Sequence, residues 1–228
     1  MGRRHSSTGG AQREAAQGRT ARGRSAGRIH GAVTVLLAVA IAVVVAVVVA
    51  VVGRRDSDGA AASTGAPLLA SAADEPGGRP VDGITADPVE RVVFHIHAHL
   101  QVYVNGQQRT VPGGIGIVPP YRIQQSAAGP FITGGRAFYW LHTHDRTGVI
   151  HIESPVRRTY SLGEFFDIWG QPLGTDQVGP VHGAVTALVN GTPFTGDPST
   201  IPLHAHDVIQ LAVGPVVTFH PFDFPQGL

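Results

Sequence analysis

The chain has 228 residues, 43% of them hydrophobic and 14% charged, and its formal net charge is +1. This length accommodates one ordinary domain with an appendage, and the small net charge gives no overall electrostatic reason to expect nucleic-acid binding. The sequence contains no cysteine and no lysine, which excludes disulfides, thiolate metal sites and Schiff-base chemistry. Its unusual feature is 12 histidines, all but His5 and His30 located after residue 88.

Residues 1–31 are polar, rich in Gly, Ser and Arg, and show no apolar periodicity. This composition predicts a disordered basic tail. Such a tail could bind nucleic acid, but no aromatic residues are interleaved with its arginines. We therefore expect no nucleic-acid partner.

Residues 32–52 form an apolar run whose one polar member is Thr34. About 20 such residues in a helix span the hydrocarbon core of a bilayer, so the run predicts a single transmembrane helix. Arginines concentrate before it, which places the N-terminus in the cytoplasm and the rest of the protein outside the cell membrane. A cleaved signal peptide is the alternative, although its apolar core would be shorter.

Small residues recur every four positions along this run and would let two membrane helices approach closely. The spacing predicts a homodimer contact, although a Val/Ala-rich segment also produces it by chance. The residues are Ala38, Ala42, Ala46 and Ala50. Residues 53–88 follow, rich in Ala, Ser, Gly, Pro and Asp, and predict a flexible linker.

Apolar and polar residues alternate from Arg91 to Val104, which predicts a β-strand. Asn105-Gly106 is typical of a type I′ hairpin turn, with a return strand over 107–111. Further β-rich runs cover 138–144 and 149–153, and then 185–189 and 209–213.

One short helix is expected in the same region. Ser161 and Glu164 form a capping box at its start, and Gly170 ends it. We therefore expect residues 89–228 to form a mainly β extracytoplasmic domain. Its architecture would be an antiparallel sandwich, an open barrel or a β-grasp-like layer with one short helix.

The histidines follow strand spacing. Two histidines separated by one residue on a strand lie on one face roughly 6.6 Å apart, so their rings can converge on one ion. If residues 145–148 form the loop of a hairpin, His142 faces His151 and Trp140 faces Glu153. A loop one residue longer or shorter would break this register.

A second row of histidines lies on the strand 91–104, and the two rows merge if the two strands are neighbours. The sequence leaves open whether they hold one ion or two. The candidate metal ligands are His95, His97, His99, His142, His144, His151 and Glu153.

His204 and His206 form another His-x-His pair, which is equally typical of turn chemistry. The remaining histidines are expected at the surface or in the core. Imidazole ligands without thiolates favour copper or zinc. The first hypothesis is therefore a membrane-anchored extracytoplasmic protein that binds copper or zinc.

Two alternatives remain open. Three histidines with an open fourth position would generate a metal-bound hydroxide, as in a hydrolase or hydratase, with Glu153 as general base or outer partner. Histidines that titrate near neutral pH would instead suit a pH-sensitive interaction module without metal. Whether the protein is an enzyme stays open, and no catalytic residue is assigned.

Five stretches of the sequence carry a resemblance. They are 94–100 (FHIHAHL), 140–145 (WLHTHD) and 148–154 (GVIHIES), followed by 162–166 (LGEFF) and Trp169-Gly170. Residues 89–228 thereby resemble a group of membrane-anchored, His-rich prokaryotic extracytoplasmic proteins, and the resemblance implies no particular activity. The His-x-His spacing is also similar to that of α-class carbonic anhydrases, but the rest of that family's pattern is not evident.

Overall fold

A computed structural model describes residues 65–72, 76–126 and 129–228. The expected tail (1–31), transmembrane helix (32–52) and alanine stripe therefore lie outside the described residues. Within the described ranges, no helix combines the length and hydropathy needed to cross a membrane.

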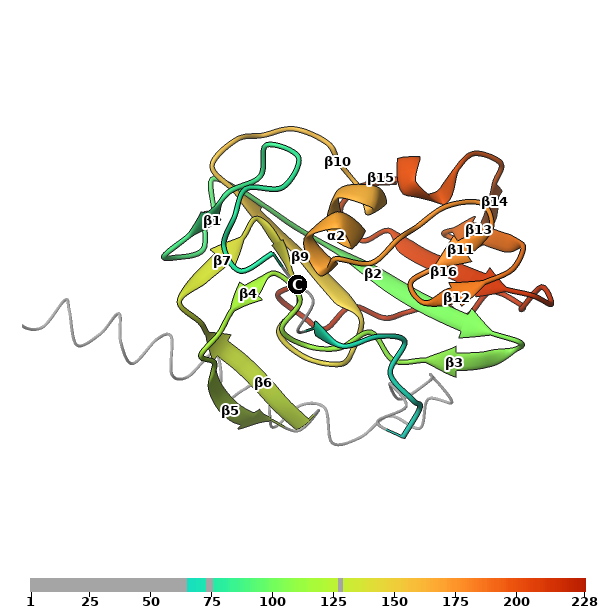
Figure 1. The fold of residues 1–228 in the computed structure, drawn as a ribbon, viewed down its shortest axis with the longest axis horizontal. Helices are drawn as coiled ribbons and strands as arrows, with labels where there is room; N and C mark the ends of the chain where they lie inside the picture. Colours follow the sequence, from blue (N-terminus) through green and yellow to red (C-terminus); the bar gives the residue numbers. More distant parts are fainter. Residues whose placement is uncertain (1–64, 73–75, 127–128) are drawn as a thin grey trace, which may run out of the picture. The chain divides into compact units, whose positions relative to one another are not determined.

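The main sheet has seven strands. Their order is β14-β13-β16-β2-β9-β8, and β3 also pairs with β2. β2 is the central strand, antiparallel to β9 and parallel to β16, as Figure 1 shows. The strands are β2 (Phe94–Val104), β3 (Gln107–Arg109), β8 (Leu141–His142), β9 (Val149–Ser154), β13 (Val185–Val189), β14 (Thr192–Phe194) and β16 (Val208–Val213).

Smaller sheets surround it. One has the order β1-β7-β4, and three are two-stranded: β5-β6, β10-β15 and β11-β12. Their bounds are β1 (Ala86–Asp87), β4 (Ile117–Val118), β5 (Arg122–Ser126), β6 (Gly129–Gly134), β7 (Ala137–Tyr139), β10 (Tyr160–Ser161), β11 (Gln177–Val178), β12 (Val181–His182) and β15 (Pro202–Leu203). A short 3₁₀ helix, η2, covers Pro198–Thr200.

The expected mainly β class with one short α-helix is confirmed for the described residues. The Asn105-Gly106 turn has positive φ at both residues, as type I′ turns require, and a second Asn-Gly turn, Asn190-Gly191 between β13 and β14, has the same conformation. The sheet is mixed rather than purely antiparallel because β16 runs parallel to β2.

Helix α2 (Leu162–Trp169) has the capping box that the sequence predicts. The Ser161 side chain accepts a hydrogen bond from the Glu164 N–H, and the Glu164 carboxylate accepts one from the Ser161 N–H. Gly170 ends the helix in the left-handed conformation at φ 71°. The cap fixes the direction in which the helix leaves β10.

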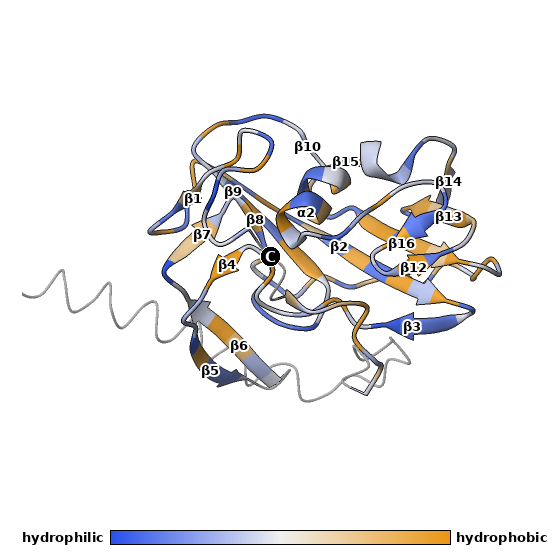
Figure 2. Cartoon of the chain, viewed as in Figure 1, coloured by the Kyte–Doolittle hydropathy of each residue, from blue (hydrophilic) through white to orange (hydrophobic). Residues whose placement is uncertain are grey.

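The core lies on one face of the main sheet. Alternate residues of β2, such as Ala98 and Leu100, are buried together with Ile150 and Ile152 of β9. Aromatic side chains of α2, among them Trp169, complete this cluster. Figure 2 shows the apolar residues in orange along β2, β9 and β16, whereas the edge strand β3 is blue. The opposite face of β2 is thereby left to its histidines.

Part of the segment expected as linker packs against the sheet domain. Leu69 is 5% exposed and Ile84 is fully buried, while Leu68 forms a β-bridge with Thr110 and β1 pairs with β7. The segment contains scattered apolar residues but no periodicity, so sequence patterns do not reveal this packing. Its side chains Leu69 and Ile84 join the core cluster, and this burial of apolar surface stabilises the packing.

Replacing Asp82 with asparagine should stabilise the protein at pH 8 but not at pH 4.5. Burial, together with a hydrogen bond to Asp82 and repulsion from it, raises the pKa of Asp167 to about 6. A raised carboxyl pKa favours the folded state at low pH, and this contribution is lost as the pH rises through about 6. The increase in the free energy of unfolding at pH 8 should be at most about 1 kcal/mol because Asp167 lies at the surface. Urea unfolding at both pH values measures it.

Asp223→Asn, at an exposed position, is the matched control. It should leave the free energy of unfolding unchanged at both pH 4.5 and pH 8. Equal stabilisation by Asp82→Asn at pH 4.5 and pH 8 would contradict the coupling of the two carboxyl groups.

Candidate metal centre

The polar face of the main sheet gathers histidines from three adjacent strands. His97 of β2 pairs with His151 of β9, and His151 pairs with His142 of β8. Two residues further along the same strand pair, on the same face, His95 pairs with Glu153. The structure therefore has the expected pairing of His142 with His151. The two rows merge through β9, which lies between the other two strands.

The first cluster comprises His95, His97, His151 and Glu153, whose ligand atoms all lie within 4.8 Å of one another. The Nε2 atom of His97 lies 3.0 Å from Nε2 of His95 and 3.2 Å from Nδ1 of His151. Oε1 of Glu153 is 3.1 Å from Nε2 of His95 and 3.4 Å from Nδ1 of His151. Each of the four ligand atoms thus lies within 3.4 Å of two others.

These separations suit a metal ion better than a hydrogen-bond network. Bonds of about 2.0–2.1 Å in a tetrahedral site place neighbouring ligand atoms about 3.3 Å apart. A neutral imidazole nitrogen either donates one proton or offers one lone pair. Nε2 of His97 faces two other imidazole nitrogens at once, so a single proton on it satisfies only one of them.

The second cluster comprises Glu90, His142 and His144. Nδ1 of His142 lies 2.9 Å from the Tyr139 carbonyl oxygen, and Nδ1 of His144 lies 2.6 Å from that of Ile132. Carbonyl oxygens only accept hydrogen bonds, so both neutral rings carry their proton on Nδ1. Both Nε2 atoms are left with a lone pair.

These two lone pairs face each other. The Nε2 atoms of His142 and His144 are 3.1 Å apart, and Oε1 of Glu90 lies 4.0 Å and 3.5 Å from them, respectively. Three acceptors without a proton between them repel one another, and a cation removes this repulsion. Burial lowers the pKa of His142 well below its usual value, which disfavours a proton as that cation.

Backbone hydrogen bonds from Nδ1 are the usual way in which a protein fixes a metal-binding imidazole. The carbonyl partners come from β7 for His142 and from β6 for His144. Small sheets outside the main sheet therefore orient the second cluster.

The loop that precedes β4 also supports this cluster through close backbone contacts. Gly116 has φ of 69°, and a Cβ there would lie 2.3 Å from the Leu141 carbonyl oxygen and 3.0 Å from Cβ of His142. The Thr143 N–H donates a hydrogen bond to the Ile115 carbonyl oxygen, and the Thr143 carbonyl oxygen accepts a hydrogen bond from the Gly114 N–H. The strand that carries His142 is thus held against a backbone that only glycine permits.

The two clusters are contiguous. His151 also groups with His142 and His144, and Glu153 also groups with Glu90 and His142, again within 4.8 Å. Oε2 of Glu153 is buried, and none of the residues that the structure describes gives it a hydrogen bond. The shared residues lie on β9, the strand between β2 and β8.

Burial keeps most of these imidazoles uncharged. It lowers the pKa of His97 to about 4 and that of His151 well below its usual range. Burial and the nearby Glu153 raise the pKa of Glu90. The site is open on one side, because the side chains of His95 and Glu90 are 41% and 36% exposed. Neutral donors and one solvent-facing side suit entry of a metal ion.

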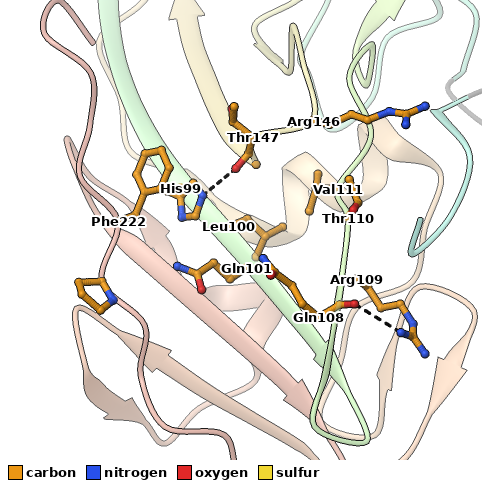
Figure 3. A pocket seen from close by; sticks show the side chains of 12 residues that line it. His99, Leu100, Gln101, Gln108, Arg109, Thr110, Val111, Arg146, Thr147 and Phe222 are labelled. Carbon is orange, nitrogen blue, oxygen red and sulfur yellow. Dashed lines mark hydrogen bonds between the residues drawn. The ribbon is translucent and has the colours of Figure 1, made fainter. Parts of the chain in front are cut away.

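His99 follows the same row of β2 but is not part of either cluster. Its Nε2 lies 2.8 Å from the Thr147 carbonyl oxygen, to which it donates, and its ring stacks on Phe222 with centroids 3.6 Å apart. Figure 3 shows both contacts beside a small pocket that Gln101, Arg109 and Arg146 also line. Burial lowers the pKa of His99 to about 4.

His204 and His206 lie in the turn before β16. Nδ1 of His204 contacts the Asp207 carboxylate at 3.1 Å, and His206 has positive φ and contacts the Leu228 carbonyl oxygen through Nε2. Neither joins a group of metal-binding side chains among the described residues. The contact of His204 with Asp207 is that of a turn, whereas His206 packs against the C-terminal segment, where its ring also stacks on Phe224.

Glu90 is the one cluster residue that the sequence does not indicate. It lies outside any strand, in the segment between β1 and β2, so no periodicity places it. Compared with known protein families, with curated proteins and with solved structures, the chain matches none.

Proposed function

We propose that the protein binds a transition metal, copper or zinc, through the histidines of β2, β8 and β9. The observation that carries the proposal is the pair of Nε2 lone pairs of His142 and His144, 3.1 Å apart with both Nδ1 atoms committed to carbonyl oxygens. Imidazole nitrogens with carboxylate oxygens are ligands that suit zinc and copper. The proposal extends to a membrane-anchored extracytoplasmic protein, on the strength of the apolar run 32–52.

Metal content tests this proposal directly. The full-length chain is purified in mild detergent, stripped with a chelator and dialysed against micromolar Zn(II) or Cu(II), and bound metal is then measured by mass spectrometry. We expect at least one tightly held ion per chain, and a loss of bound metal in His142→Ala. His182→Ala, which removes an exposed histidine, should retain the wild-type content. Wild-type protein that takes up neither metal would overturn the proposal.

A metal-dependent hydrolase or hydratase is the second candidate, and the open side at His95 and Glu90 favours it. A water molecule on the ion at that side would be acidified and could attack a substrate. Turnover of simple esters or CO₂ by zinc-loaded protein, lost in His97→Ala, would support it. Full metal occupancy without any turnover favours binding or delivery. The lowered pKa values of His97 and His151 count against a switch that operates near neutral pH.

A further inference from the structure

We infer that the two clusters hold two metal ions, bridged by the carboxylate of Glu153. This inference rests on the proposed function and specifies how many ions the protein binds and which residues they share. It follows from the number of donor atoms, from the direction of their lone pairs and from one buried carboxylate oxygen.

The first cluster completes a coordination shell by itself. Its four donors are Nε2 of His95, Nε2 of His97, Nδ1 of His151 and Oε1 of Glu153. Each lies 3.0–3.4 Å from two of the others, and all lie within 4.8 Å of one another. Four such donors satisfy a tetrahedral ion. This shell uses neither Nε2 of His142 nor that of His144.

The second cluster has three donors of its own. Nε2 of His142, Nε2 of His144 and Oε1 of Glu90 converge from β8, from the residues after it and from the segment before β2. A fourth donor is needed for a tetrahedral shell. Glu153 lies within 4.8 Å of both Glu90 and His142, so it is close enough to complete the shell.

The unpartnered oxygen of Glu153 identifies the bridge. Oε1 contacts His95 and His151, whereas Oε2 is buried without a hydrogen bond from any described residue. A buried carboxylate oxygen without a partner is costly. An ion in the second cluster would satisfy it, and the carboxylate would then join the two ions.

Charge supports the same arrangement. The ligand atoms of two carboxylates, Glu90 and Glu153, lie within 4.8 Å of each other and of His142, so their negative charges repel each other. Two divalent ions turn this repulsion into attraction. Carboxylate-bridged ions in two-metal sites lie about 3.5–4 Å apart, a distance that fits two clusters sharing residues of one strand.

Stoichiometry is the first test, with variants specific to each cluster. His95→Ala removes a donor of the first cluster, and His144→Ala removes one of the second. In full-length protein loaded with Zn(II), wild type should bind two ions per chain and each variant one. Circular dichroism and thermal unfolding of the metal-free variants confirm that they fold. His182→Ala should bind two ions.

Electron paramagnetic resonance of the Cu(II)-loaded protein tests the bridge. Two Cu(II) ions joined by Glu153 should give a coupled spectrum with a half-field transition, which His144→Ala should convert to the spectrum of an isolated ion. Glu153→Gln should abolish the coupling and weaken binding of at least one ion about 100-fold.

Each result decides between the claims. One ion in wild type, lost from either single variant, overturns the two-ion inference and leaves the proposed function standing. Two ions without magnetic coupling overturn the bridge. Wild-type protein that binds no metal overturns both the inference and the proposed function.

Discussion

His151→Ala should weaken metal binding at the first cluster by at least about 100-fold in the dissociation constant, and at the second cluster by a smaller factor. His151 supplies Nδ1 to the first cluster and belongs to the group formed with His142 and His144. Its ring packs edge-on against those of His97 and His144. Losses of 10- to 100-fold follow even from mutation of residues that merely orient ligands. Removing a ligand of the first ion should therefore cost more than this, whereas the second ion loses only a neighbouring ring. Isothermal titration with Zn(II) measures both constants.

The matched control is His99→Ala, which removes a buried histidine from the same face of β2 but outside both clusters. It should disturb packing against Phe222 while leaving both dissociation constants within a few-fold of wild type. If His151→Ala weakens both ions by the same factor, His151 is a ligand of both, which contradicts its assignment to the first cluster. If His99→Ala weakens binding as much as His151→Ala does, the general loss of packing explains the effect.

Metal should raise the melting temperature of the protein by roughly 8–16 °C. An ion that binds only the folded chain adds RT ln(1 + [M]/Kd), which is about 4 kcal/mol at a concentration 1,000 times the dissociation constant. For a domain of this size, each kcal/mol shifts Tm by roughly 2–4 °C. Differential scanning calorimetry with and without excess Zn(II) measures the shift, and a second bound ion would enlarge it.

Addition of a chelator should return Tm to the metal-free value. The double variant His95→Ala/His144→Ala loses one ligand from each cluster and should show a shift of at most a few degrees. An equal shift in wild type and in the double variant would place the stabilising ion elsewhere in the chain.

The sequence predicts part of the site well, for a physical reason. Strand side chains alternate with a period of two, so His142, His151 and Glu153 are assigned to one face once the four-residue loop 145–148 sets the register. The structure has that register for His142 and His151. The capping box at Ser161 and both Asn-Gly turns are equally local signals, and they also match.

Other features depend on contacts between distant residues, which local patterns do not contain. The position of β9 between β2 and β8 follows from packing of the whole sheet, and so does the parallel pairing of β16 with β2. Glu90 reaches His144 because the irregular segment before β2 folds over the sheet, and a single carboxylate in such a segment gives no periodic signal. His99 lies in a row with His95 and His97, yet the Thr147 carbonyl and Phe222 engage it instead.

The parallel pairing of β2 with β16 has a consequence for biosynthesis. β2, β8 and β9 are complete once Ser154 has been made, but β16 begins only at Val208. Until then one edge of β2 has no neighbour, and an open edge is a template for association with other chains. A nascent chain that has not yet reached β16 therefore already contains the histidines of β2, β8 and β9, but its open sheet edge makes it prone to aggregation. Premature termination before Val208 should yield insoluble protein even when every ligand is present.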